Sequence, residues 1–229
     1  MNHRDRRKAE RKKREPRKGH TREPKANSFL IVTEGTKTEP YYFQGLAEKI
    51  EKTRGGNIHI HGVEPIVDIE GEGRATQKLV DRTSEILHRA KIFYQQVWVV
   101  FDKDDFHDFD EAVEEAEKRG FHAAWSNECF EYWLYLHFRY SQRAQTRYAW
   151  YRLLHEEFRK QKLGKGLYKK NYDRLFDMVA KDGGLDRAIQ NAKERMKAYK
   201  KGVSWPSGFN PGTTVHLLVE ELRKYIKED

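Results

Sequence analysis

The hydrophobic positions follow two alternating patterns from residue 29 onward. Short continuous apolar runs at 29–32 and 97–101 are typical of strands that are covered on both faces. Between them, apolar residues recur on one helical face, as in the stripe from Leu79 to Ala90. This alternation predicts strand and helix units that assemble into a parallel sheet.

The pattern predicts four strands and four helices before residue 140, in strict alternation. We therefore expect an α/β fold with a mostly parallel sheet of about four strands and helices on both faces. Proline interrupts the second strand region at position 65. The expected strands lie at 29–32, 58–69, 97–101 and 121–125, and the expected helices at 36–50, 79–90, 110–118 and 130–138.

The chain beyond Tyr140 shows no convincing strand pattern. Apolar stripes at helical spacing predict helices near 150–158, 172–179, 185–196 and 215–226, with a dense turn cluster at 205–212. A chain of 229 residues has room for one α/β domain and a smaller subdomain. We therefore place the α/β domain at 29–140 and a helical subdomain at 141–229.

The net charge of +9 is concentrated at the N-terminus. Residues 1–28 contain 12 Lys/Arg against four acids, and no apolar residue larger than alanine follows Met1 before Phe29. Such a segment buries too little to offset its ordering entropy, which predicts a disordered basic arm at 1–28. The arm suits a phosphate-backbone anchor, and a solubilising tail remains the alternative. The residues that we expect to contact nucleic acid are Arg6, Arg7, Lys12, Lys13, Arg14, Arg17 and Lys18.

Composition excludes several classes of protein. The longest aliphatic and aromatic run has five residues, at 97–101, whereas a membrane-spanning helix needs about 20. The N-terminus has charge but no apolar segment behind it, which argues against a secretory signal. One cysteine, Cys129, excludes an internal disulfide and a multi-cysteine zinc site. We expect a cytoplasmic protein.

Acidic residues follow the first and third predicted strands. Glu34 and Gly35 end the first strand, and Asp102 and Asp104 end the third. Ligands bind beyond the carboxyl ends of parallel strands, so these residues are expected to face one pocket. Alternate residues of an extended chain point to the same side, which pairs the two aspartates. Three close carboxylates repel one another unless a divalent cation neutralises them, which favours a Mg²⁺ or Mn²⁺ site.

Neighbouring residues extend this candidate site. Asp105 is a further candidate metal ligand, and Gly35 would let a phosphate approach the backbone closely. Lys37 suits either a contact to the scissile phosphate or a solvated position in a first helical turn. Spacing alone also allows 102–105 to be a helix N-cap with solvated acids, although the strand order favours the metal site.

Further candidates follow the fourth strand. Asn127 and Glu131 suit supporting groups or an additional metal ligand, and the alternative is an Asn N-cap with Glu131 in the first turn. A basic and aromatic region follows at 139–170, which suits single-stranded RNA or DNA. The alternative for this region is ordinary helices with apolar faces inward and lysines outward. Its members are Arg139, Arg143, Arg147, Arg152, Lys160, Lys162, Lys165, Lys169 and Lys170, interleaved with Tyr140, Tyr148, Trp150, Tyr151 and Tyr168.

Four segments resemble the ordered motifs of the RloB-like (AbiLii-like) family. They lie at 30–43, 99–105, 126–138 and 210–215, and Glu128 and Gly212 depart from residues common in the family. The resemblance implies a Toprim-like fold and a nuclease of bacterial defence systems. It also implies acid/base work for Glu34 and metal binding for Asp102 and Asp104. Relatives work beside an ATPase of the ABC or AAA type.

We therefore expect a Mg²⁺-dependent Toprim-type nuclease acting in antiphage defence. Analogy favours RNA, tRNA included, over DNA. A non-catalytic nucleic-acid adaptor with a vestigial acidic pocket is the alternative. A phosphotransferase is disfavoured because the DxD follows the third strand and is not itself followed by the Gly-Thr pair that such enzymes carry. The sequence contains no GxxxxGK[ST] loop, so we expect control by a separate ATPase or another defence sensor, with a homo-oligomer left open.

Overall fold

The computed structural model describes residues 29–54, 58–62, 75–90, 94–105, 107–199 and 205–226. The predicted basic arm at 1–28 and the predicted strand region after residue 62 lie outside the described residues. None of the helices in the described ranges is long and apolar enough to cross a membrane.

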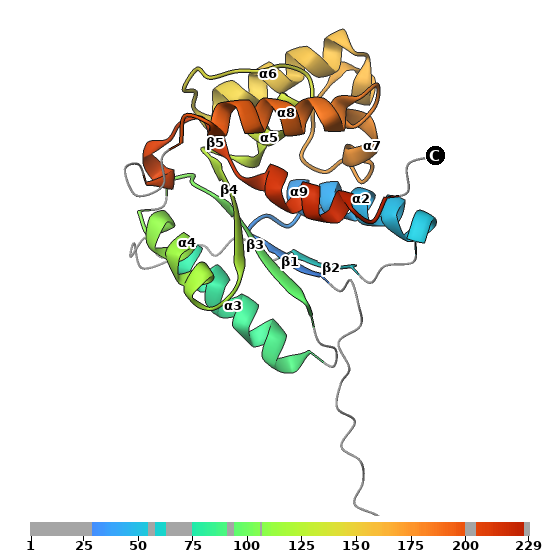
Figure 1. Ribbon diagram of the computed structural model, residues 1–229. Helices are drawn as coiled ribbons and strands as arrows, with labels where there is room; N and C mark the ends of the chain where they lie inside the picture. Colours follow the sequence, from blue (N-terminus) through green and yellow to red (C-terminus); the bar gives the residue numbers. More distant parts are fainter. Residues whose placement is uncertain are drawn as a thin grey trace, which may run out of the picture.

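A five-stranded sheet forms the centre of the molecule, in the order β2-β1-β3-β4-β5 (Figure 1). The first four strands pair in parallel, and β5 pairs antiparallel with β4. The expected α/β fold with a mostly parallel sheet is therefore confirmed. The strands are β1 (Phe29–Thr33), β2 (Ile58–Gly62), β3 (Gln96–Asp102), β4 (His122–Asn127) and β5 (Gly212–Thr213).

The fifth strand corrects the expectation that no strand follows Tyr140. It has only two residues, which pair with Ser126 and Asn127, so it has no apolar run to reveal it. Gly212 fits there because a Cβ at this position would lie 2.8 Å from the carbonyl oxygen of Phe209. The C-terminal part of the chain thus contributes directly to the sheet.

Helices cover both faces of the sheet (Figure 1). The helices α3 and α4 lie on one face, and α2, α9 and the group from α5 to α8 lie on the other. The first helix begins at Thr38, two residues after the expected start at 36. The helices are α2 (Thr38–Arg54), α3 (Ala75–Arg89), α4 (Phe109–Lys118), α5 (Phe130–Leu136), α6 (Arg147–Lys160), α7 (Leu175–Val179), α8 (Gly184–Met196) and α9 (Val215–Arg223), with short 3₁₀ turns η1 (Leu163–Gly166) and η2 (Pro206–Gly208).

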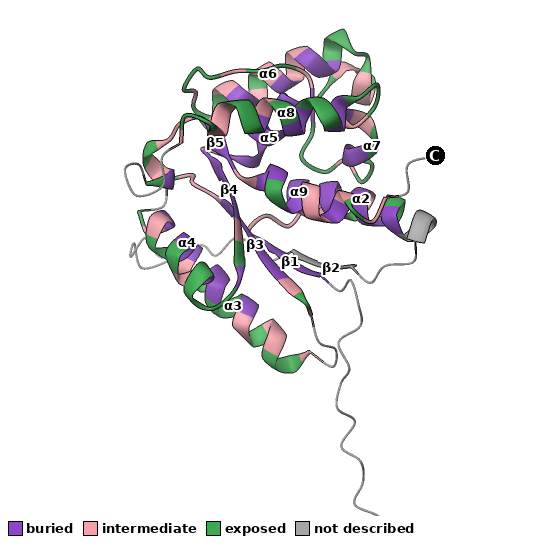
Figure 2. Ribbon diagram, in the orientation of Figure 1, coloured by how far each residue is buried: buried purple, intermediate pink, exposed green. Residues whose placement is uncertain are grey.

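Alternate residues of the central strands enter two hydrophobic cores. In β1, Phe29 and Ile31 pack with α2 and the C-terminal helices, whereas Leu30 and Val32 pack with α3 and α4. All four side chains are buried, and Figure 2 shows the central strands buried along most of their length. The continuous apolar runs in the sequence reflect this coverage on both faces.

The C-terminal helices share one of these cores with the sheet. Trp133 of α5 and Trp150 of α6 are fully buried in the cluster that also contains Ile31. Trp150 and Tyr168 are therefore core residues. The ordinary helical interpretation is correct for Trp150, whereas Tyr168 is buried from a segment outside the helices. The hydrophobic core contains residues from both sides of position 140. The proposed division into two units at this position stays a prediction.

Candidate functional site

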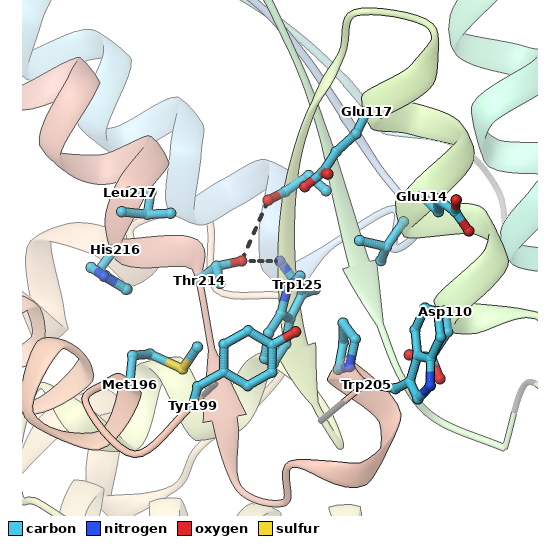
Figure 3. Close-up of a pocket in the computed structure, with 13 residues that line it drawn as sticks. Asp110, Glu114, Glu117, Trp125, Met196, Tyr199, Trp205, Thr214, His216 and Leu217 are labelled. Atoms are coloured by element: carbon cyan, nitrogen blue, oxygen red, sulfur yellow. Dashed lines mark hydrogen bonds between the residues drawn. The ribbon is translucent and has the colours of Figure 1, made fainter. Parts of the chain in front are cut away.

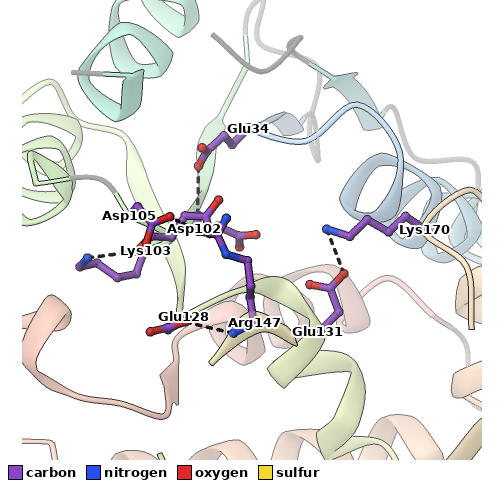
Figure 4. Close-up of polar contacts among 9 residues, drawn as sticks. Glu34, Asp102, Lys103, Asp105, Glu128, Glu131, Arg147 and Lys170 are labelled. Atoms are coloured by element: carbon purple, nitrogen blue, oxygen red, sulfur yellow. Dashed lines mark hydrogen bonds and ion pairs between the residues drawn. The ribbon is translucent and has the colours of Figure 1, made fainter. Parts of the chain in front are cut away.

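Two acidic residues meet at the carboxyl ends of β1 and β3. Glu34 directly follows β1, and its backbone N–H donates to the carbonyl of Val100 over 3.2 Å. The backbone N–H of Asp102, the last residue of β3, donates to Oε2 of Glu34 over 3.2 Å (Figure 4). The parallel pairing of β1 with β3 thus brings these two strand ends together, as the sequence predicts.

The two aspartates are not arranged as an extended pair. The strand ends at Asp102, and the chain turns so that Asp104 adopts a left-handed conformation with φ of 40°. The N–H of Asp104 donates to the carbonyl of Glu128 over 3.0 Å, which fixes this turn. The N-cap alternative for 102–105 is also wrong, because α4 begins only at Phe109. Both aspartates nevertheless line the same cavities.

These cavities form a cleft with two lobes, which we call the carboxylate cleft. One lobe, of about 230 Å³, lies beside the loop between β1 and α2. The other, of about 290 Å³, lies beside the start of α5 and of α6. Asp102, Asp104 and Lys170 line both lobes. The first lobe is completed by Glu34, Gly35, Thr36, Lys37, Thr38 and Glu39, and the second by Cys129, Glu131, Arg147, Tyr148 and Tyr151.

Burial and mutual repulsion disfavour negative charge in the cleft. Burial raises the pKa of Glu34 to about 8. The hydrogen bond from the N–H of Asp102 lowers this pKa, and the nearby carboxylates of Glu39 and Asp104 raise it further. Burial likewise raises the pKa of Glu39 to about 7. The pKa of Asp102 is raised well above its usual value by burial and by the surrounding glutamates. A bound divalent cation would relieve this cost by neutralising the ionised carboxylates.

The residues fit a hard divalent cation in kind. The Oδ1 atom of Asp102 is buried and accepts no hydrogen bond, so one acceptor in the cleft lacks a partner. Carboxylate oxygens are the ligands that Mg²⁺ and Mn²⁺ prefer. Within the described residues, however, no three Asp, Glu, His or Cys side chains already form a ligand set. Asp104 is instead paired with Arg147.

Three residues of the cleft were not predicted as a group with the aspartates. Glu39 is buried at the first lobe. Arg147 pairs with Asp104 and with Asp105, and Lys170 lies 3.3 Å from Oε1 of Glu131 (Figure 4). The sequence pattern placed Glu39 in the helix expected at 36–50 and the two basic residues in the basic and aromatic region at 139–170. The positions of Arg147 and Lys170 depend on helices and loops that pack against the strand ends from far along the chain.

The predicted supporting residues lie in different places. Lys37 lines the first lobe and is exposed, whereas Asp105 is exposed and lines neither lobe. Gly35 makes room for the carboxyl group of Glu39, which a Cβ there would meet. Its suggested role with phosphate stays a prediction.

Asn127 and Glu131 separate from one another. The side-chain amide of Asn127 donates to the carbonyls of Pro206 and Ser207, over 3.0 and 2.8 Å, so it fastens the η2 turn to β4. It is not the N-cap of α5, because that position belongs to Cys129. Glu131 lines the second lobe, and the hydroxyl of Tyr168 donates to its Oε1 over 3.1 Å.

The sole cysteine of the chain, Cys129, is buried at the cleft. Burial, together with the nearby carboxylates of Glu131 and Asp102, raises the pKa of its thiol well above the usual value. The thiol therefore stays protonated at neutral pH, and Cys129 acts as a small buried side chain rather than a nucleophile.

A larger cavity lies elsewhere, between α4, β4 and the start of α9 (Figure 3). Its volume is about 670 Å³, and its walls combine the aromatic side chains of Trp125, Tyr199 and Trp205 with carboxylates of α4. Its described lining residues include no lysine or arginine. This cavity does not suit a phosphate backbone, so the carboxylate cleft is the better candidate site.

The raised pKa values predict that the metal-free protein loses stability as pH rises from about 4.5 to about 8. In this window folded Glu34 and Glu39 retain protons that the unfolded chain releases. We expect urea unfolding in EDTA to show a falling free energy between pH 5.5 and 8.5, and Glu34→Gln to flatten this fall. A free energy that rises throughout this range would contradict the burial of these acids.

Buried His137 gives the opposite dependence at lower pH. Burial lowers its pKa to about 3, so its contribution to stability is lost as pH falls below about 6.5. The Glu34→Gln variant should keep this acidic limb, which separates the two causes in the same measurement.

Comparison with known proteins gives one match. The family described as RloB-like protein matches residues 29–222, which is most of the chain. No curated protein and no solved structure matches.

Proposed function

This chain belongs to the RloB-like protein family, and from that premise we propose that it is a metal-dependent nuclease of the Toprim type acting in antiphage defence. The observation that carries the proposal is the contact between Glu34 and Asp102 at the carboxyl ends of neighbouring parallel strands. A buried and unpartnered carboxylate oxygen of Asp102 at the same point supports it.

In this proposal Asp102 and Asp104 hold Mg²⁺ or Mn²⁺, with Glu34 beside them. Such an ion, when bound, polarises a phosphate oxygen and orients the attacking water. The high pKa of Glu34 suits it to hold or release a proton near neutral pH, as general acid/base catalysis requires. Lys37 is exposed at the first lobe, and in this proposal it contacts the phosphate backbone.

RNA, tRNA included, is the substrate that the family resemblance favours, with DNA as the second choice. One observation favours a non-catalytic nucleic-acid adaptor instead. Arg147 already neutralises Asp104, so the acidic cleft of the described structure does not need a metal ion to offset that charge. Metal binding and cleavage therefore distinguish the two functions.

The proposal is tested with 5′-labelled single-stranded RNA and DNA, in Mg²⁺ or Mn²⁺ and in EDTA. We expect cleavage in the divalent ions that EDTA abolishes. Binding of Mn²⁺ is measured separately, from the loss of the free-ion signal in electron paramagnetic resonance. A chain that binds nucleic acid but neither binds Mn²⁺ nor cleaves in any of these conditions would be the adaptor.

The N-terminal arm gives a further prediction. Deleting residues 1–26 removes 12 Lys/Arg, so nucleic-acid binding should weaken at low salt and depend less steeply on salt concentration. The expected slope change is several units of log affinity per log salt if most of these side chains contact phosphates. Fluorescence anisotropy of a labelled oligonucleotide, at salt concentrations from about 50 to about 300 mM that span physiological ionic strength, measures this slope. Equal slopes for the full and truncated chains would make the arm a solubilising tail.

We also propose control by a separate protein, an ATPase of the ABC or AAA type or another defence sensor. The sequence has no nucleotide-binding loop of the GxxxxGK[ST] kind with which to regulate itself. Weak cleavage by the purified chain, increased by a protein that co-purifies with it from its native host, is the expected result. Full activity of the isolated chain without toxicity in cells would contradict this proposal.

A further inference from the structure

Arg147 holds two aspartates at the mouth of the carboxylate cleft. It is the first residue of α6, and its guanidinium forms ion pairs with Asp104 through Nη1 and with Asp105 through Nη2 (Figure 4). Its backbone N–H donates to Oε2 of Glu128 over 3.0 Å, which fixes the start of the helix. The side chain remains 34% exposed, so its guanidinium can exchange partners with molecules from solution.

Tyr148 lies beside it and is the most exposed of the large hydrophobic side chains that the structure describes as exposed, at 79%. It lines the same lobe of the cleft as Asp104, and the guanidinium carbon of Arg147 lies 5.7 Å from its ring centroid. An exposed aromatic ring beside a cation at the edge of a polar cleft is typical of a stacking platform for unpaired bases.

Asp104 cannot serve Arg147 and a metal ion equally well. A divalent cation at Asp102 and Asp104 competes with the guanidinium for the same carboxylate, so its arrival weakens the ion pair. The displaced guanidinium keeps the exposed Asp105 as a partner, at a position where solvent weakens the pair. It is then available to a phosphate group, for which guanidinium has favourable bidentate geometry.

We infer that Arg147 and Tyr148 form a subsite for single-stranded nucleic acid, in which Arg147 exchanges Asp104 for a backbone phosphate once a divalent cation binds, and Tyr148 stacks on the adjacent base. The inference rests on the proposed function and extends it to the side of the cleft on which the substrate lies. It also makes nucleic-acid binding depend on the metal ion, through one shared carboxylate.

The exchange predicts opposite effects of one substitution. Without nucleic acid, Arg147→Ala removes the competitor for Asp104, so Mn²⁺ should bind about three- to tenfold more tightly. The matched control is Arg152→Ala, an exposed arginine on the next turns of the same helix. Electron paramagnetic resonance of free Mn²⁺ gives both affinities. Equal affinity in the two variants would overturn the exchange.

The second measurement is the binding of fluorescein-labelled oligouridylate and oligothymidylate. The oligomers are about 12 nucleotides long, which is enough to fill a single-strand groove. Ca²⁺ replaces Mg²⁺ in this assay to limit cleavage. Arg147→Ala and Tyr148→Ala should each weaken binding about fivefold or more, the latter through lost stacking. Tyr148→Trp should retain it. The control for the ring is Trp205→Ala, an exposed aromatic residue that lines neither lobe. Whichever oligomer binds more tightly identifies the preferred sugar.

The outcomes separate this inference from the proposed function. If the wild-type chain binds Mn²⁺ and an oligomer, but Arg147→Ala and Tyr148→Ala match their controls, only the subsite is wrong. If the wild-type chain binds neither ion nor oligomer, the proposed function fails and the subsite with it. Circular dichroism checks that each variant folds. If Arg147→Ala is unfolded, Arg147→Lys takes its place, because lysine keeps the charge but lacks the guanidinium fork. We expect Arg147→Lys to show an intermediate loss of binding.

Discussion

Replacing Asp102 with asparagine is expected to lower divalent-ion-dependent cleavage by about a thousandfold, the range that removal of one key charge-stabilising group produces. Asparagine is nearly isosteric but lacks the charge that holds a hard cation. Asp104→Asn should have a similar effect, since both aspartates line both lobes of the cleft. Single-turnover cleavage of labelled RNA in saturating Mg²⁺ measures the loss.

The fold should survive these substitutions. Asp102 lies among carboxylates whose repulsion and burial raise its pKa, so loss of its charge should leave metal-free thermal stability unchanged or higher. Two aspartates serve as controls. Asp177→Asn alters an exposed pair with Arg174 on α7, and Asp105→Asn alters an aspartate that lines neither lobe.

The Asp105→Asn control also tests whether Asp105 is a metal ligand. Cleavage close to wild type in Asp105→Asn would remove Asp105 from the metal site, to which the sequence had assigned it. Unchanged cleavage in both Asp102→Asn and Asp104→Asn would instead remove the catalytic assignment of the cleft. Loss of cleavage with unchanged Mn²⁺ binding would place the aspartates in substrate binding.

The meeting of Glu34 with Asp102 was predictable because it depends on strand order alone. Both residues follow short apolar runs, and parallel strands in one sheet present their carboxyl ends at one edge. The turn at Asp104 was not predictable in this way. Its conformation depends on a hydrogen bond to Glu128, which belongs to the segment after β4 rather than to the strand itself.

The basic residues of the cleft illustrate a second limit. Arg147 and Lys170 are 45 and 68 positions beyond Asp102 in the chain, and no local pattern distinguishes them from the lysines and arginines around them. Their positions follow from the packing of α6 on α5 and from the fully buried ring of Tyr168, which precedes the loop position of Lys170 by two residues. Tertiary packing therefore determines which two of these basic residues reach the cleft, and the sequence pattern alone does not distinguish them from the others.

The last prediction concerns Lys170 and Glu131. The Glu131 residue is only 3% exposed, and it is held by the ammonium of Lys170 and the hydroxyl of Tyr168. Lys170→Met should lower the free energy of unfolding by about 1–2 kcal/mol, less than for a fully buried pair because the lysine is partly solvated. Lys169→Met, at an exposed neighbour, is the control. Urea unfolding at constant pH measures both.

The double variant Lys170→Met/Glu131→Gln separates the structural role from a role in catalysis. It removes both members of the ion pair, so most of the lost stability should return, and the net charge of the cleft equals that of the wild type. A loss of stability in the double variant equal to the sum of the losses in Lys170→Met and Glu131→Gln would show that the pair is not coupled. Cleavage that stays low in the stable double variant but is normal in Glu131→Gln alone would mean that Lys170 contacts the substrate, because neither instability, excess negative charge nor loss of the Glu131 carboxylate would then explain it.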